Sequence, residues 1–251
     1  MIIRKSGAEI EAMARAGRVV VETLELLGDA VAAGVTTAEL DAIAEEHIRS
    51  RGGVPTFKGY RGFPASICAS PNAMVVHGIP GSYRLEDGDL LSVDVGVTLD
   101  GFVADSAHTF AVGDVDADAQ RLLDAGQAAL AAGIVEARPG NHVGDISAAV
   151  QRTTEDAGFA VIRTLVGHGV GRSMHEEPQV PNYGEPGRGP KLSPGMTLAI
   201  EPMITAGSEE VFVADDRWSI STVDDSLSAH FEHTVAVTEN GPLVLTHDED
   251  R

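Results

Sequence analysis

The sequence predicts an α+β fold built from two similar halves. Two capped amphipathic helices near the N-terminus precede several strand-like segments, and the same order of two helices followed by strands occurs again. A strong turn signal, Asp100-Gly101, makes the first long strands antiparallel. No linker or low-complexity segment interrupts the 251 residues. We therefore expect one domain over 1–251, although the length also accommodates two small domains, and the repeated order suggests an internal duplication.

The first two helices each begin with a capping box. Ser6 opens one helix and Thr36 opens the next, and each is followed three residues later by a glutamate that can return the capping hydrogen bond. Apolar residues then recur at three- and four-residue intervals, which indicates amphipathic helices. We expect the first helix to end near Gly34 and the second near residues 52–53.

The later segments alternate between strands and helices. Residues 53–64 form a loop punctuated by Gly and Pro, and a strand pair is expected at 66–69 and 74–77. The turn at 100–101 joins two long apolar strands, and two helices and a series of short strands follow it. The expected ranges are 90–99 and 101–112 for the long strands, and about 116–137 and 143–157 for the helices.

The composition excludes several classes of protein. The formal net charge of −20 argues against direct binding of nucleic acid, which requires a basic surface. No apolar run is long enough to span a bilayer, and the N-terminus lacks the apolar segment of a signal peptide. A single cysteine rules out an internal disulfide framework and fits a reducing compartment. We therefore expect a cytoplasmic protein without membrane contact.

Five acidic or imidazole side chains lie in short apolar stretches. A bare carboxylate in such a place costs on the order of several kcal/mol. Four carboxylates and one imidazole are therefore best explained by cations that they share. We predict two divalent metal ions held by Asp94, Asp105, His168, Glu201 and Glu232.

The hairpin brings two of these residues together. A two-residue turn sets Asp94 opposite Ala107 and, on the next strand, Asp105 opposite position 96. The two aspartates then share one face as diagonal neighbours, roughly 7–8 Å apart at the backbone, which is wide enough to hold a cation. We expect Gly96 to leave room for that cation. The alternative is that both aspartates are solvated, but valines already supply an apolar face.

The other candidates carry weaker individual signals. Glycines on both sides of His168 indicate a backbone pressed against a neighbour, although a lone histidine is more often an ordinary core or surface residue. His175 can donate a hydrogen bond to a developing oxyanion. Glu201 or Glu232 could be a buried acid paired with arginine, which is reasonable for one of them and poor for both.

The donor set indicates a class of chemistry. Oxygen-rich coordination with one imidazole suits Co, Mn, Fe or Zn. Two such ions about 3.5–4 Å apart polarise a carbonyl and generate a hydroxide near neutral pH. The residues alone therefore predict a two-metal hydrolase of amide, ester or phosphate bonds.

Several motifs, in their order along the chain, resemble those of the type I methionine aminopeptidases of peptidase family M24. The similarity covers nearly the whole chain and is carried by NAMVVHGIP, DVGV, ADSAHTF, GHGVGRSMHEEP, AIEPM and FEHTVAV. It implies the pita-bread fold, a pseudo-twofold pair of αβ halves with the metals between two curved antiparallel sheets. It also implies removal of the initiator methionine from nascent polypeptides whose second residue is small.

The resemblance implies a role for each metal ligand. Asp94 would bind one ion only, while Asp105 and Glu232 would bridge both ions. His168 and Glu201 would complete the shell of the other ion. A hydroxide between the ions would attack the scissile carbonyl, and Glu201 would also shuttle a proton.

The resemblance implies substrate contacts as well. His175 would stabilise the tetrahedral intermediate, and His77 would assist at the scissile amide. An apolar pocket suits a flexible thioether; its residues would be Tyr60, Phe63, Cys68 and Trp218, with Phe57 and Met174 alongside. Ordinary packing is the alternative for each of these. A thiol dyad of Cys68 with His77 would leave the five ligands unexplained.

Two positions depart from the family pattern. His230 stands where the family usually has glutamine, and Pro71 precedes Asn72, where a monovalent cation is expected. Two other functions remain as alternatives: an X-Pro dipeptidase or aminopeptidase, which would carry a large N-terminal domain, and a non-catalytic pita-bread binding protein, which would have lost ligands. We expect a monomer that meets nascent chains in transient proximity to the ribosome.

Overall fold

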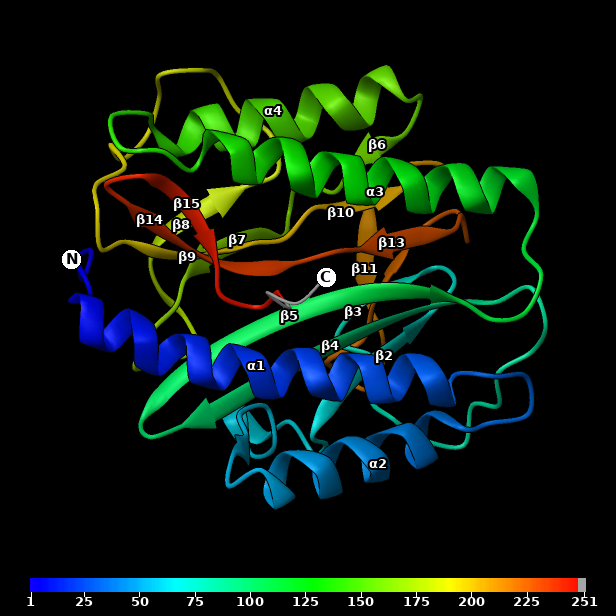
Figure 1. Cartoon of the computed structure of the whole chain (residues 1–251). Coiled ribbons are helices and arrows are strands. Elements are labelled where there is room, and N and C mark those ends of the chain that lie inside the picture. Colours follow the sequence, from blue (N-terminus) through cyan, green and yellow to red (C-terminus); the bar gives the residue numbers. More distant parts are fainter. Residues whose placement is uncertain (248–251) are drawn as a thin grey trace.

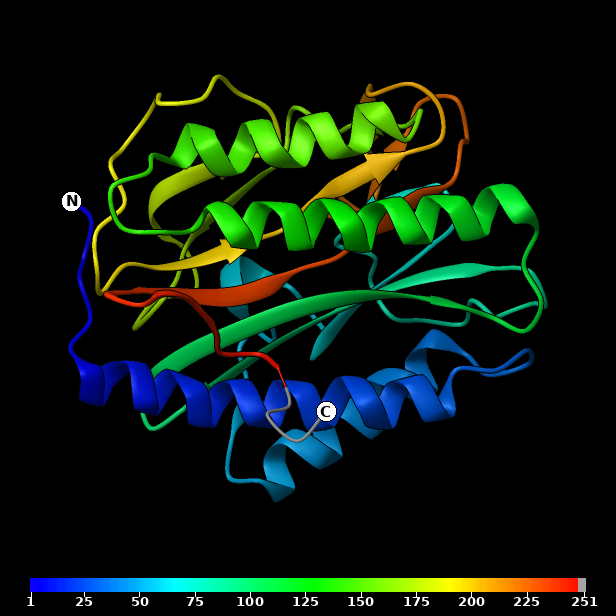
Figure 2. The same cartoon turned by 45° about the horizontal axis from the view of Figure 1, so that its top comes forward.

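The computed structural model describes residues 1–247 and places antiparallel strands between two pairs of helices (Figure 1). One pair is α1 (Gly7–Ala30) and α2 (Thr37–Ser50). The other is α3 (Ala117–Glu136) and α4 (Val143–Asp156). The view in Figure 2 shows the long green strands of the first half between α1 and α3. The expected α+β architecture of two similar halves is present.

The N-terminal helices begin as predicted. Ser6 and Thr36 each accept a hydrogen bond from the N–H three residues on, and the glutamate there returns it, so both capping boxes form. α1 ends at Ala30, before the predicted boundary at Gly34. The C-cap Val31 is already extended, with ψ of 111°, and the chain then turns at Gly34, where φ is 93° and the N–H donates to Leu85 O at 2.7 Å.

The predicted hairpin and its register are confirmed. Residues 100–101 both have positive φ, as the favoured two-residue turn requires. The register sets Asp94 opposite Ala107 and Asp105 opposite Gly96. The strands are β4 (Leu90–Leu99) and β5 (Phe102–Ala111).

The predicted strands at 66–69 and 74–77 form but do not pair with each other. β2 (Ile67–Pro71) pairs with β4, as does β1 (Val54–Pro55), whereas β3 (Met74–Val76) pairs with β12 (Ile220–Thr222). The backbone groups of the turn between β2 and β3 form hydrogen bonds with other segments of the chain. The Asn72 N–H donates to a β4 carbonyl and its own carbonyl accepts from residue 228.

The second half is organised around a five-stranded sheet in the order β15-β14-β9-β7-β8. Its strands are β7 (Val166–Gly169), β8 (Glu176–Pro181), β9 (Thr197–Ile200), β14 (His233–Thr238) and β15 (Gly241–Val244). The other strands form two small sheets, in the orders β13-β10-β6 and β11-β12-β3. Their remaining members are β6 (Ala160–Val161), β10 (Met203–Thr205), β11 (Val211–Val213) and β13 (Ser228–His230), and a 3-10 turn, η1, covers Tyr60–Gly62.

Each half has its own hydrophobic core. Val20, Leu40 and Val93 belong to the core of the first half, and Leu122 and Leu198 to that of the second. Each such side chain contributes about 1.5–3 kcal/mol when it is fully buried. The separate cores and the repeated helix pairs agree with an internal duplication. Within residues 1–247, no helix combines the length and apolarity that a membrane crossing requires.

Candidate metal centre and its pocket

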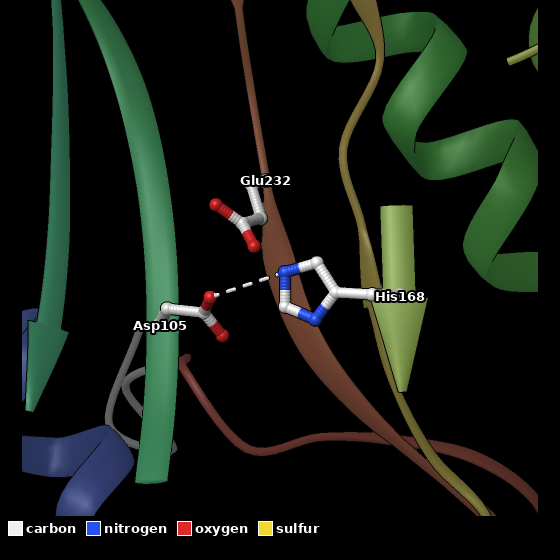
Figure 3. A group of neighbouring side chains, drawn as sticks. All are labelled: Asp105, His168 and Glu232. Atoms are coloured by element: carbon white, nitrogen blue, oxygen red, sulfur yellow. Dashed lines mark ion pairs between the residues drawn. The ribbon is translucent and has the colours of Figure 1, made fainter. Parts of the chain in front are cut away.

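The five predicted ligands lie around one cavity between the two halves. The cavity has a volume of about 290 Å³ and its wall includes Asp94, Asp105, His168, Glu201 and Glu232. The two aspartates come from the hairpin of the first half, His168 comes from β7, and the two glutamates lie directly beside strands of the second half. Figure 3 shows Asp105 and Glu232 directed toward the His168 ring. One ligand atom from each of these three residues lies within 4.8 Å of the others.

Strand pairing explains why the two glutamates are neighbours. Ile200, the last residue of β9, pairs with His233, the first residue of β14. Glu201 and Glu232 continue these paired strands by one residue each, which brings them to the same end of the ladder. The Glu232 N–H also donates to Ala107 O on β5 at 2.9 Å, so the second sheet is tied to the hairpin at this point.

Asp105 is held by the same junction. Its N–H donates to Thr234 Oγ1 at 3.0 Å, and the Thr234 hydroxyl lies 2.8 Å from the Asp105 carbonyl and 3.1 Å from Oδ1. Oδ2 is buried and has no hydrogen-bond partner among residues 1–247, and the same is true of Oδ1 of Asp94. Two orphaned carboxylate oxygens in one cavity are the feature that a bound cation would explain.

The glycines around His168 allow β7 to fit between its neighbours. A Cβ at Gly167 would lie 2.4 Å from Ala199 O, and one at Gly169 would lie 2.3 Å from Glu177 O. The predicted close approach of backbone at this point is confirmed. It places His168 opposite Ala199 in the middle of the sheet.

The His168 ring presents one nitrogen to the carboxylates. Nδ1 lies 2.9 Å from Gly169 O and serves as the donor there. Nε2 lies 3.7 Å from Asp105 Oδ2 and 3.5 Å from Glu201 Oε1. A neutral imidazole in this tautomer offers its lone pair to a cation between the three groups.

Burial shapes the charge state of the cluster. It raises the pKa of Asp94 and Glu232 well above their usual range and that of Glu201 to about 8, and the neighbouring carboxylates add to each rise. The pKa of Asp105 is raised by burial, against the opposing effect of His168. Carboxylates that resist ionisation in the bare cavity fit divalent cations, which restore the favourable charged form.

The expected role of Gly96 is wrong. A Cβ there would lie 2.6 Å from the Phe57 ring, so the missing side chain leaves room for Phe57 and not for a cation. Phe57 belongs to the loop before β2 and packs onto the ligand-bearing face of the hairpin.

Both predicted substrate-contacting histidines line the cavity. His77 follows β3 with φ of 60°, and burial lowers its pKa to about 4, so its ring is neutral. His175 lies at the exposed rim, where partial desolvation lowers its pKa and the charges of neighbouring groups add to the effect. Its Nδ1 lies 2.9 Å from the Tyr60 hydroxyl, and its ring centroid is 4.2 Å from that of His168.

The structure also groups the predicted methionine-pocket residues along this cavity, namely Tyr60, Phe63, Cys68 and Trp218, together with Phe57 and Met174. The Phe63 and Trp218 rings meet edge to face at 5.1 Å. Cys68 pairs with Asp94 across β2 and β4. Burial raises the pKa of the Cys68 thiol well above its usual range, which disfavours the thiolate that a thiol dyad requires.

The cavity includes residues that were not predicted. Thr164, Leu165 and Val166 lead into His168, and Arg61 and Met203 also contribute to the wall. The apolar run before Gly167 was the available signal for the first three. Asn72, the expected cation position, lies outside this wall in a hydrogen-bonded turn, where its side chain bonds to Asp89 Oδ1 at 2.8 Å. The monovalent cation stays a prediction.

Comparison with known proteins agrees with this geometry. The family model for metallopeptidase family M24 matches residues 11–239. A methionine aminopeptidase of Clostridium perfringens is 52% identical over 246 residues, which are 98% of this chain and 99% of that protein. The crystal structure of methionine aminopeptidase from Rickettsia prowazekii superposes with a TM-score of 0.97 at 40% identity, covering 98% of this chain and 100% of that one.

A more distant neighbour shares the fold alone. Prolidase from Pyrococcus furiosus has a TM-score of 0.79 at 22% identity, and the match covers 98% of this chain but 66% of that one. The expected pita-bread fold and the expected family are therefore confirmed. The chain belongs to metallopeptidase family M24 and, within it, to the methionine aminopeptidases.

Proposed function

We propose that this protein removes the initiator methionine from nascent polypeptides whose second residue is small. The observation that carries the proposal is a single cavity whose wall joins Phe63, Cys68 and Trp218 to four carboxylates, of which Asp105 and Glu232 are fully buried. A flexible thioether packs well among aromatic rings and sulfur. The cationic α-amino group of the same residue is attracted to the acidic cluster. This arrangement suits the first residue of a chain and no later one.

The donor set fits two divalent ions of the Co, Mn, Fe or Zn class. Asp94, Asp105, His168, Glu201 and Glu232 would hold these ions, with Asp105 and Glu232 as the carboxylates that both ions would share. When bound, such ions polarise a carbonyl and lower the pKa of a water molecule to about 7. The Asp105 and Glu232 carboxylates suit a shared position because the junction of β5 and β14 holds them both.

The remaining residues position the substrate and move protons. Glu201 accepts the proton of the attacking water and delivers it to the leaving nitrogen. The Tyr60 hydroxyl donates to Nδ1 of His175, so that the Nε2–H of His175 is free to donate to the developing oxyanion. We assign to His77, which is neutral and close to Trp218, the role of assisting at the scissile amide.

The cellular setting follows from the substrate. Residues 1–251 would act as one catalytic domain, in the cytoplasm and as a monomer. Its substrates would be the N-termini of nascent polypeptides, met in transient proximity to the ribosome.

The test is release of methionine from Met-Ala-Ser and Met-Lys-Ser, with Ala-Pro as a third substrate. Apo protein, metal-reconstituted protein and two variants are compared: Asp105→Asn, and Asp118→Asn on the exposed face of α3 as the matched control. We expect metal-dependent release from Met-Ala-Ser alone, lost in Asp105→Asn and kept in Asp118→Asn. Cleavage of Ala-Pro instead would indicate an X-Pro dipeptidase. Folded protein that releases nothing with any divalent metal would be a binding protein.

A further inference from the structure

One buried imidazole beside the carboxylates has no role in the proposed reaction. His230 ends β13, is 2% exposed and lines the same cavity. Its Nε2 is buried and has no hydrogen-bond partner among the described residues. A buried polar atom without a partner lowers the stability of the fold unless a ligand binds to it.

The distances around this nitrogen are those of ligands that share an ion. Nε2 of His230 lies 3.6 Å from Glu201 Oε2 and 3.9 Å from Glu232 Oε2. Hydrogen bonds of this kind span about 2.7–3.2 Å. Two donors that each lie about 2.0–2.2 Å from one ion can be separated by up to roughly 4.4 Å. The corresponding distances from His168 Nε2 to its carboxylates, 3.7 and 3.5 Å, fall in the same range.

The two imidazoles flank one carboxylate. His168 faces Oε1 of Glu201, and His230 faces Oε2. We propose that His230 is a sixth metal ligand and binds, through Nε2, the ion that Glu201 holds. This inference rests on the proposed function, because it requires the metal pair. A neutral imidazole adds a donor without disturbing the balance between four carboxylates and two dications.

The backbone of His230 is fixed before any ion arrives. Its N–H donates to Thr109 Oγ1 at 2.9 Å, and the Thr109 hydroxyl donates to its carbonyl at 2.9 Å. β13 also pairs with β10, where His230 lies opposite Met203. A side chain anchored on rigid strands from two directions suits a ligand position, because little conformational freedom is lost on binding.

The proposal has a consequence for metal preference. A second imidazole favours Co and Zn over Mn, which prefers oxygen donors. His230→Gln should therefore weaken Co(II) binding by roughly 10–100-fold, the loss typical when a metal site is deprived of a supporting group, and weaken Mn(II) binding less. Isothermal titration of the full-length apo protein measures both. His108→Gln is the matched control, because this imidazole packs between Phe110 and Phe231 in another cavity.

The wild-type protein gives a test that does not depend on a variant folding. In the Co(II)-loaded enzyme, each ligating imidazole has a ring N–H with a paramagnetically shifted, exchangeable proton NMR signal. We expect two such signals, one of which disappears in His230→Gln and neither in His108→Gln. A single signal in wild type, with unchanged Co(II) affinity in His230→Gln, would overturn the inference while methionine release continued. Wild-type protein that binds no divalent ion would overturn the proposed function as well.

Discussion

At the residue scale, removing the carboxylates of the site from water costs free energy of folding. Asp94 and Asp105 each keep an oxygen buried without a partner, and burial raises the pKa of both. Removing a charge from water costs several kcal/mol, on the order of what a buried pair loses when one partner is removed. The fold tolerates this because the cations of the proposed function would supply the missing interactions.

Tyr60 determines which nitrogen of His175 carries the proton in the proposed mechanism. Tyr60→Phe removes the hydroxyl that lies 2.9 Å from Nδ1 and frees the ring to adopt the other tautomer. One such hydrogen bond contributes about 0.5–1.5 kcal/mol, so kcat for Met-Ala-Ser should fall by up to about tenfold with little change in KM. Steady-state kinetics measure this. Tyr183→Phe, whose ring lies against Arg163, is the control; an unchanged kcat in Tyr60→Phe would contradict the assignment.

The site residues differ in how far the sequence could predict them. Charges in apolar stretches mark Asp94 and Glu232 without any knowledge of the fold, because burial of a charge needs a reason. Gly96 could not be interpreted correctly, since its neighbour Phe57 comes from a distant loop and no local pattern records that contact. The apolar run that contains Leu165 was a weak signal, because an apolar residue in an apolar run has an ordinary explanation in core packing.

At the element scale, local chemistry predicted the helices and the hairpin, and long-range pairing escaped it. Capping boxes and the turn at 100–101 are encoded by neighbouring residues, so both were found. The strands with which β2 and β3 pair were not predicted. This pairing depends on the hydrogen bonds that hold the Asn72 turn to strands far along the chain. Hydrophobic periodicity defines a strand but does not name its partner.

The close packing of β7 yields a prediction for one glycine. Gly167→Ala would place a methyl group 2.4 Å from Ala199 O, which forces β7 away from β9 and displaces His168. We expect destabilisation of about 1–3 kcal/mol or more and weaker metal binding, measured by urea unfolding and titration calorimetry. Gly7→Ala, at the first position of α1 with nothing within 4 Å, carries the same change and should be neutral or stabilising. Equal stability of the two variants would contradict this account.

At the scale of the whole molecule, each half contributes its own core, and the two halves meet at a shared apolar cluster and at the acidic centre. Each half has a separate hydrophobic core, while the contacts between β5 and the segment of Glu232 and Thr234 bring acidic groups together. The cost of assembling that acidic junction depends on pH, because protonation removes the repulsion. The free energy of unfolding of the metal-free protein should therefore change with pH as these acidic groups titrate.

The sign of the pH effect follows from two opposing sets of groups. Folding raises the pKa of the clustered carboxyls, that of Glu201 to about 8, so the folded apo protein binds more protons than the unfolded chain and loses stability as pH rises toward 8. Folding lowers the pKa of His77 and His230 to about 4 from 6.5, so these groups add stability as pH rises from 4 to 6.5. The two sets oppose each other below pH 6.5.

By about pH 7.5 the histidines of the unfolded chain have also lost most of their protons, and the carboxyls then dominate the pH dependence. The free energy of unfolding of the apo protein should therefore fall as pH rises from about 7.5 to 8, by about 1.4 kcal/mol per pH unit for each extra proton that the folded protein binds. Saturating Co(II) or Mn(II) should abolish or reverse the fall, because metal affinity rises as the ligands lose protons. Urea unfolding at three pH values, with and without metal, measures both slopes. Apo stability that is flat or rising across this window would mean that the carboxylates are already compensated within the fold and need no cation.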